Sequence, residues 1–411
     1  MFKKAKLSLQ NFRNAQFGSL TGSAAIGQII TYLTLPFLAR VYSPDEFSGF
    51  SKFLSWVIPL SILASFRIEL AIPSQPSKEL QYKTAFISLT LLIMASVGIQ
   101  LLLALGEILG FHLSYMYGLL PIGIISTSAP QILFFLNTSL QRNVQSASYR
   151  IFNNIVLQLT SIFLGYTTLG ASGLIIGYLV GQWVGILILL KGHFYTLWSW
   201  KNKIQWQEIS LEYKEYVLFA TPQAIIETLQ LSGTIFFLTI LFGEPYPGIF
   251  YLCWRILQAP VNLISNSIFV IEYNKCSQLS ARNLPYISRI KKSFRSLTII
   301  AIPMGLIFLF FGPQIFTLVL GEQHAFSGKM ASYLSLWFVV QFIVSPFSYT
   351  AILAQKQHLS LLFNSFDIIA KLMAFSIGFL FDNIWMGLGT YSVLSAIIGL
   401  GIYRWYLQIS S

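Results

Sequence analysis

Three long apolar stretches of the chain carry charged and polar side chains at helical spacing. Residues three or four positions apart share one face of a helix. Such faces are formed by Gln223, Glu227, Gln230 and Thr234, by Tyr251, Arg255, Gln258, Asn262 and Ser265, and by Asn364, Asp367 and Lys371. Ionisable groups within apolar helices usually face a bundle interior or a water-filled cavity. The pattern therefore predicts a polar lumen lined by the first two of these stretches.

Each charge also has a purely structural explanation. Arg255 lies well inside its stretch, and Glu227, at similar depth on the preceding one, would be its partner in a buried ion pair. Lys371 and Asp367 are four residues apart and would neutralise each other along one helix. Arg67 lies near the end of another apolar stretch, where a long side chain can reach the lipid headgroups.

Residues for enzymatic chemistry form no recognisable arrangement. The four histidines are scattered, and Cys253 and Cys276 fit neither a disulfide framework nor a metal-binding spacing. The chain has no glycine-rich phosphate loop followed by Lys-Ser or Lys-Thr. We therefore predict a protein that is not an enzyme and uses no metal and no cofactor.

The composition indicates the elements that must position the polar faces. Hydrophobic residues make up 55% of the 411 residues and charged residues 10%, whereas a soluble domain has about 25% charged residues. A membrane-spanning helix needs roughly 20 mostly apolar residues. Twelve segments qualify, at about 17–38, 50–72, 84–105, 115–138, 150–168, 171–191, 216–242, 247–270, 294–312, 331–353, 358–380 and 385–406. The predicted fold class is an all-α integral membrane protein with about twelve transmembrane helices.

The positive charges predict the orientation of the helices. Lys and Arg concentrate in alternate connections, which places those connections and both termini in the cytoplasm. The net charge of +12 is thereby explained as a topology signal, without a nucleic-acid partner. The basic connection at the midpoint predicts a six-helix lobe at 1–191, a cytoplasmic linker at 192–215 and a second six-helix lobe at 216–411. Similar strings that open the second and eighth helices suggest repeats related by a pseudo-two-fold axis along the membrane normal.

Three strings in the sequence resemble motifs of one membrane protein family. Residues 38–49 read LARVYSPDEFSG, residues 66–73 read FRIELAIP, and Trp254-Arg255-Ile256-Leu257 precedes Pro260. In this order, and at these helices, they resemble the Wzx-type polysaccharide flippases of the multidrug/oligosaccharidyl-lipid/polysaccharide exporter superfamily. The chain departs from the family pattern at Ser48 and at Ile68, where tyrosine is frequent.

The resemblance implies a flippase in a bacterial inner membrane. Such proteins move undecaprenyl-diphosphate-linked oligosaccharide repeat units, for example of the O-antigen of lipopolysaccharide, from the inner to the outer leaflet. The resemblance further implies alternating access by two lobes, with polymerase and glycosyltransferase partners and a proton or sodium gradient as the driving force. The chemistry of the residues is compatible, because Arg binds phosphate oxygens bidentately.

Site residues follow from this expectation. We predict that Arg255 holds the pyrophosphate, with Arg67 and Lys371 assisting. The residues predicted to line the lumen and contact the glycan are Gln223, Gln230, Gln258, Asn262 and Tyr251. Either Glu227 or Asp367 would carry the coupling proton or sodium ion.

Two other functions fit part of the pattern. A drug or metabolite exporter of the same superfamily would favour a carboxylate-rich cavity, whereas the charges here lean cationic. A membrane glycan polymerase or glycosyltransferase would need a sizeable outer loop with reacting groups. The longest outer connection, about 313–330, offers only Glu322, His324 and Lys329.

Overall fold

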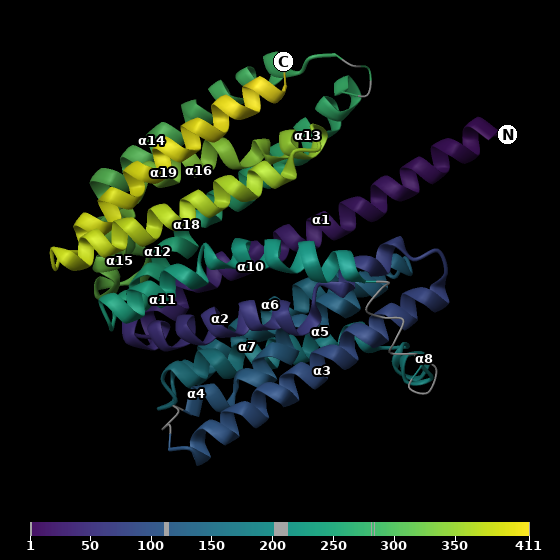
Figure 1. The fold of residues 1–411 in the computed structure, drawn as a ribbon, viewed down its shortest axis with the longest axis horizontal. Coiled ribbons are helices and arrows are strands. Elements are labelled where there is room, and N and C mark those ends of the chain that lie inside the picture. Colours follow the sequence, from purple (N-terminus) through teal and green to yellow (C-terminus); the bar gives the residue numbers. More distant parts are fainter. Residues whose placement is uncertain (1, 111–114, 201–212, 281, 283, 411) are drawn as a thin grey trace. The chain divides into compact units, whose positions relative to one another are not determined.

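The computed structural model describes residues 2–110, 115–200, 213–280, 282 and 284–410, and the regular elements of these residues are all helices (Figure 1). The chain divides into two compact units. Unit 1 comprises Met1–Val41 and Phe53–Thr228, and unit 2 comprises Tyr42–Lys52 and Leu229–Ser411. The lobe boundaries at 1–191 and 216–411 stay a prediction, and residues 201–212 of the predicted linker lie outside the described residues.

Unit 1 is built around a core of apolar side chains from α3, α5 and α7, with α6 packed against both α1 and α7. The elements are α1 (Phe2–Val41), most of α2 (Pro44–Ser65), the 3-10 helix η1 (Ile68–Ser74), α3 (Lys78–Ile108), α4 (Tyr115–Gly118), α5 (Leu120–Ser139), α6 (Asn143–Gly165), α7 (Ala171–Leu190), α8 (Phe194–Trp198), the π-helix η2 (Tyr216–Ala220) and α10 (Thr221–Leu229).

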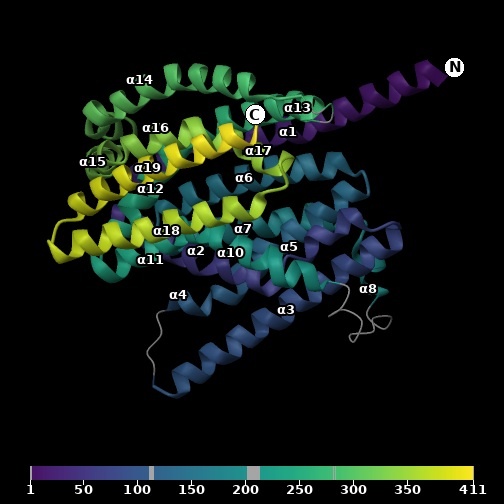
Figure 2. The same ribbon diagram turned by 45° about the horizontal axis from the view of Figure 1, so that its top comes forward.

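In unit 2, α16 packs against both α14 and α19, and α18 packs along α19 (Figure 2). The elements are α11 (Ser232–Leu241), α12 (Tyr246–Pro260), the π-helix η3 (Val261–Ser265), α13 (Asn266–Ser280), α14 (Ile287–Leu320), η4 (Glu322–His324), α15 (Ala325–Tyr333), α16 (Ser335–Val344), η5 (Ser345–Ser348), α17 (Tyr349–Leu353), α18 (Gln357–Leu380) and α19 (Ile384–Ile409).

The predicted spans agree with these elements. Each of the twelve predicted segments lies mainly on helical residues, and the fifth and sixth segments are separate helices, α6 and α7. Within the described part of the chain, nine helices are long and apolar enough to cross a membrane, and α10 with α11 adds a tenth if counted together. The two other predicted spans are α6, which carries Arg150, Asn153 and Asn154, and α12–α13, which η3 divides. The all-α membrane fold class is confirmed and is compatible with two six-helix lobes; the pseudo-two-fold axis stays a prediction.

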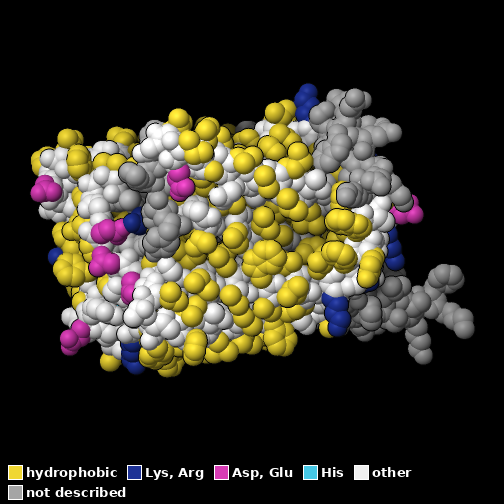
Figure 3. Space-filling model, turned by 90° about the horizontal axis from the view of Figure 1, so that it is seen from below, with side chains coloured by type: hydrophobic (Ala, Val, Ile, Leu, Met, Phe, Trp, Pro, Cys, Tyr) yellow, Lys and Arg dark blue, Asp and Glu magenta, His cyan; other side chains and the backbone are white. Residues whose placement is uncertain are grey.

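The surface has the polarity that a membrane requires. On the face shown in Figure 3, hydrophobic side chains cover most of the middle, and the charged side chains gather mainly toward the two ends. On α3, Leu101 and Leu102 are 65% and 69% exposed. Large apolar patches of this kind face lipid or a partner in native proteins, since exposure to water would cause aggregation.

Three glycines on α7 let it approach α6 closely. Gly177, Gly181 and Gly185 are spaced four residues apart, so they share one face of the helix. A Cβ atom added at Gly181 would lie 2.6 Å from the Cβ of Leu157 on α6. This is the small-residue packing by which membrane helices gain close van der Waals contact.

The start of α2 belongs to unit 2 and is fixed by a capping box. The amide of Ser43 donates to the carboxylate of Glu46 at 2.6 Å, and the amide of Glu46 donates to the Ser43 hydroxyl at 3.3 Å. These bonds satisfy amides that a helix start leaves open. A Cβ added to Gly248 on α12 would lie 2.1 Å from the Pro44 carbonyl oxygen, so glycine is required where these helix starts meet. The string 38–49 therefore builds a helix start packed on α12.

A buried polar network joins α3, α5 and the residues after α7 in unit 1. Asn137 donates both amide hydrogens, to the carbonyl oxygens of Leu133 and Leu189 at 2.9 Å each. Its Oδ1 therefore accepts from Nε2 of His193 at 3.1 Å. Nδ1 of His193 then accepts from the Tyr82 hydroxyl at 2.8 Å. The network holds His193 as a neutral imidazole with the proton on Nε2.

Candidate functional site

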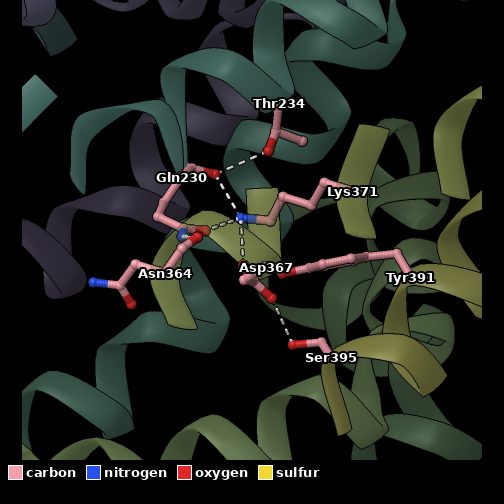
Figure 4. Close-up of polar contacts among 7 residues, drawn as sticks. All are labelled: Gln230, Thr234, Asn364, Asp367, Lys371, Tyr391 and Ser395. Atoms are coloured by element: carbon pink, nitrogen blue, oxygen red, sulfur yellow. Dashed lines mark hydrogen bonds and ion pairs between the residues drawn. The ribbon is translucent and has the colours of Figure 1, made fainter. Parts of the chain in front are cut away.

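The centre of the candidate site is Lys371 on α18, whose ammonium group points toward Gln230 and Asp367 (Figure 4). Lys371 is 1% exposed. Its Nζ lies 3.3 Å from Oδ2 of Asp367, one helical turn earlier. Nζ also donates to the carbonyl oxygen of Gln230 at 2.9 Å and to Oε1 of the same residue. The ammonium is thus held by a set of oxygen atoms that compensates for the water it has lost.

A second layer of contacts holds these oxygen atoms in place. Asp367 accepts hydrogen bonds from Ser395 at 3.0 Å and from the Tyr391 hydroxyl at 3.4 Å, both on α19. Nε2 of Gln230 donates to the carbonyl oxygen of Asn364 at 3.1 Å. The rings of Tyr391 and Trp254 lie 5.2 Å and 5.4 Å from Nζ of Lys371. These distances are short enough for cation–π attraction.

The helix that carries Gln230 is interrupted at this point. The predicted span 216–242 contains α10 and α11, which are separated by Gln230 and Leu231. The Gln230 carbonyl oxygen accepts from the Thr234 hydroxyl at 2.9 Å as well as from Lys371. Side chains that insert into the helical hydrogen-bond ladder in this way bend or break helices. The expectation of one continuous polar face from Gln223 to Thr234 is therefore corrected, because the helix is broken at Gln230.

Unit 2 contains two neighbouring pockets, the first of which shares Gln230 and Asp367 with the Lys371 cluster. The first, of about 150 Å³, is lined mainly by apolar residues, namely Val340, Val344, Phe363, Ile398, Ile402 and the rings of Trp254 and Trp337, which stack at 4.5 Å between centroids. Its polar lining includes Gln230, Gln341, Asn364, Asp367 and Ser395. The second, of about 270 Å³, is lined by Gln258, Asn262, Ser265, Gln341, Ser345 and Ser348. Gln341 lines both pockets, which brings them next to each other. Amide and hydroxyl groups dominate the second pocket and can bind a hydroxyl-rich ligand.

Arg255 lies on α12. In the sequence it follows Trp254, which lines the first pocket, and precedes Gln258, which lines the second. Its guanidinium is half-buried and donates through Nη1 to the Tyr251 hydroxyl at 3.3 Å. Tyr251 is itself buried, with its ring packed edge-on against Phe50 at 5.9 Å. Among the described residues of unit 2, no carboxylate forms an ion pair with Arg255. Glu227 belongs to unit 1, so the Arg255–Glu227 pair stays a prediction.

Arg67 lies in unit 1 at a break in the second predicted span. Phe66 and Arg67 have φ angles of 49° and 54°, a left-handed conformation that costs energy for residues with a Cβ. Helix α2 therefore ends at Ser65, before the end of the predicted span at 72. Nη1 of Arg67 lies 3.5 Å from Glu69, which is 2% exposed. Nε of Arg67 is buried without a hydrogen-bond partner in the described part of the chain. A strained, incompletely bonded arginine is the kind of group that a bound anion would complete.

The remaining predicted residues, Gln223 and Glu227, lie on α10 in unit 1. Both are exposed, and Nε2 of Gln223 donates to Glu227 at 3.2 Å. The structure thus gathers Gln230, Asp367 and Lys371 into one cluster and Gln258 with Asn262 into one pocket. Arg255 and Tyr251 form a separate contact on the same helix.

Sequence reasoning missed the aromatic residues and the α19 side chains of the site. Trp254 and Trp337 stack although they are far apart in the sequence, and Tyr391 and Ser395 reach Asp367 from another helix. The one available signal was the spacing of Tyr391 and Ser395, which places both on the same face of their apolar helix.

Comparisons with known proteins agree with this fold. A family model described as "Polysaccharide biosynthesis protein" matches residues 37–329. The lipid II flippase MurJ in an inward closed conformation has a TM-score of 0.68 at 13% identity, covering 96% of this chain and 90% of MurJ. An inward-facing multidrug resistance MATE family transporter of the MOP superfamily has a TM-score of 0.61 at 15% identity, covering 93% of this chain and 94% of the transporter.

A MOP superfamily transporter from Pyrococcus furiosus has a TM-score of 0.58 at 14% identity, covering 96% of this chain and 95% of that protein. At these identities, the structures show a shared fold. A search of curated protein sequences finds no match. The family model covers well over half of the chain and confirms the resemblance drawn from the three sequence strings. The chain therefore belongs to this family of polysaccharide biosynthesis proteins and has the fold of the MOP superfamily of membrane transporters.

Proposed function

We propose that this protein is a flippase for undecaprenyl-diphosphate-linked oligosaccharide repeat units in a bacterial inner membrane. It would work by alternating access of its two lobes, with both termini in the cytoplasm. The family supports a role in polysaccharide biosynthesis, and a lipid II flippase shares the fold. Polymerases and glycosyltransferases that act on the same repeat unit would be its partners.

The observation that carries the proposal is the placement of Arg255. A half-buried arginine without a carboxylate partner in the described part of unit 2 favours binding of an anion. Gln258 and Asn262 follow it on the same run of helix and line the larger polar pocket. In this proposal, Arg255 binds the pyrophosphate bidentately. The glycan would bind along Gln258, Asn262 and the neighbouring hydroxyls.

The other cations have secondary roles in the proposal. Arg67 would assist at the pyrophosphate, as the sequence pattern predicts. Lys371 is enclosed by Asp367 and Gln230, so it would join the substrate only after Asp367 has turned away or gained a proton. Asp367 is the preferred site of the coupling proton or sodium ion, and Glu227 on α10 is the alternative.

The Lys371–Asp367 pair also argues against the alternative function, export of a drug or metabolite. A cationic drug would need a carboxylate that is available to it, whereas the Asp367 carboxylate already contacts an ammonium. The polar pocket around Gln258 is lined by uncharged groups. Both features favour a hydroxyl-rich substrate over an organic cation.

The experiment is complementation of a strain that lacks its own copy of this protein. Arg255→Ala, Arg255→Lys and the control Arg404→Ala would be expressed at matched membrane levels, and surface polysaccharide would be measured. Arg404 is exposed on α19 and lines neither pocket. We expect the alanine variant at 255 to lose most surface polymer, the lysine variant to retain part, and the control to behave as wild type. Unchanged polymer in Arg255→Ala would refute the assignment.

A further inference from the structure

An open pocket of about 510 Å³ lies between α13 and α14 in unit 2, apart from the residues described above. On α13 it is lined by Ile268, Ile271, Glu272 and Lys275, which recur every three or four residues and so form one face. On α14, Arg289 and Lys292 face it together with several serines. The pocket therefore combines an apolar wall with a cluster of charges.

The acidic residue in the pocket is already neutralised. Arg289 binds Glu272 in a bidentate ion pair, with Nε and Nη2 each 3.1 Å from a carboxylate oxygen. Glu272 is 7% exposed, so its carboxylate lies at the buried side of the pocket. The carboxylate is consequently unavailable to repel an anion.

The two lysines in the pocket remain uncompensated. Lys275 and Lys292 are both exposed, and neither forms an ion pair with any described residue. With Glu272 neutralised by Arg289, the pocket has an excess of two positive charges from opposite helices. Two ammonium groups that face the same space attract a phosphate-sized anion.

The apolar wall lies where a membrane surface would meet the pocket. Ile271 is 51% exposed, and Ile268 lies one turn farther from Lys275 along α13. Helix α14 begins at Ile287 with polar turns and continues as a span apolar enough to cross a membrane. Cations therefore lie at the polar end of a spanning helix, and the exposed Ile271 and the half-buried Ile268 lie beside them. A soluble anion would use only the cations, whereas a lipid would use both features.

We propose that this pocket binds the headgroup of an anionic phospholipid. The lipid phosphate lies between Lys275 and Lys292, and an acyl chain runs along Ile271 and Ile268. Glu272 and Arg289 hold the two helices at the separation that the headgroup needs. The site is independent of the proposed transport path and of the substrate that the protein carries.

The test measures lipid affinity of the purified full chain in detergent. The probes are dioctanoyl phosphatidylglycerol, dioctanoyl phosphatidylcholine and inorganic phosphate. The variant Lys275→Gln/Lys292→Gln is compared with Lys291→Gln/Arg295→Gln, which removes the same charge from exposed positions of α14 that do not line the pocket. Melting temperatures without lipid verify that both variants are folded, and Lys292→Gln against Lys291→Gln serves as a milder pair.

We expect the pocket variant to raise the Kd for phosphatidylglycerol about 30-fold, since each lysine near a membrane surface contributes a factor of about five. The control pair should change the Kd by less than about threefold, because salt screens cations that do not touch the ligand. Phosphatidylcholine and inorganic phosphate should bind more weakly to the wild type. Equal losses in the two variants would overturn the proposal by showing non-specific attraction. Inorganic phosphate that binds as tightly as the lipid would also overturn it by showing a free-anion site.

Discussion

The ammonium of Lys371 is buried 3.3 Å from the partly exposed carboxylate of Asp367, at the point where the helix that carries Gln230 is broken. The i, i+4 spacing alone gives a weak interaction on an exposed helix. Here the two residues also contact Gln230, Tyr391 and Ser395, and the lysine side chain is 2% exposed. The pair on α18 therefore connects Gln230, which precedes α11, with Tyr391 and Ser395 on α19.

Removing both members of the pair should destabilise unit 2 by less than the sum of the two single removals. Lys371→Met leaves Asp367 without its counter-ion, and Asp367→Asn leaves a buried ammonium with less compensation. We expect each single variant to cost about 3–5 kcal/mol, and the double variant to cost less than the sum, because a lone buried charge is the most costly arrangement. The measurement is a double-mutant cycle from unfolding in detergent. Strictly additive losses would contradict the coupling.

The His193 network should make stability depend on acid pH. Burial, together with the nearby positive charge of Arg142, lowers the pKa of His193 from 6.5 to about 4. As pH falls from about 6.5 to about 4, the unfolded chain gains a proton that the folded protein excludes, so the folded state loses stability. The loss should approach about 3 kcal/mol, at about 1.4 kcal/mol for each unit of pKa. Above this window, His193 is neutral in both states and contributes no slope.

Unfolding measured across this pH range, with wild type and His193→Gln side by side, checks the assignment. The glutamine variant cannot gain the proton, so its stability should fall less steeply between pH values of about 6.5 and 4. Parallel curves for the two proteins would assign the acid sensitivity to other groups.

The close packing of α6 and α7 should not tolerate a side chain at Gly181. An added Cβ would lie 2.6 Å from the Cβ of Leu157 and 3.0 Å from the carbonyl oxygen of Asn153. We expect Gly181→Ala to lower the free energy of unfolding by about 1–3 kcal/mol, the usual cost of overpacking. Gly98→Ala on α3 is the matched control, since no atom lies within 4 Å of its added Cβ. If Gly98→Ala lowered the free energy of unfolding as much as Gly181→Ala, the loss would reflect helix propensity and not the contact between α6 and α7.

The sequence predicts the helices well and the breaks in them poorly. Hydropathy averaged over about 20 residues reports burial in lipid, so all twelve predicted segments lie mainly on helical residues. The breaks at Arg67 and at Gln230 arise from local backbone strain and from Lys371, a residue distant in sequence. The spacing of residues along one helix reveals neither the backbone strain nor the contact with Lys371.

The site residues show the same difference between what the sequence predicts and what it does not. Spacing along one helix predicts that Asp367 and Lys371 share a face, and the structure contains that ion pair. Contacts between helices, such as Trp254 with Trp337 and Asp367 with Ser395, depend on packing and have no periodic signal. The role of Arg255 as the pyrophosphate ligand is still a prediction, because it depends on a substrate.

The most direct test of that role is transport by the purified protein in proteoliposomes. Labelled undecaprenyl-diphosphate oligosaccharide would be placed in one leaflet, and its appearance in the other leaflet would be followed for wild type, Arg255→Ala and Arg404→Ala. Loss of a bidentate arginine–phosphate contact of about 3 kcal/mol should slow transport by Arg255→Ala at limiting substrate by about 100-fold. This role of Arg255 predicts that loss for Arg255→Ala alone, with Arg404→Ala near the wild-type rate. Equal rates for all three proteins would contradict it.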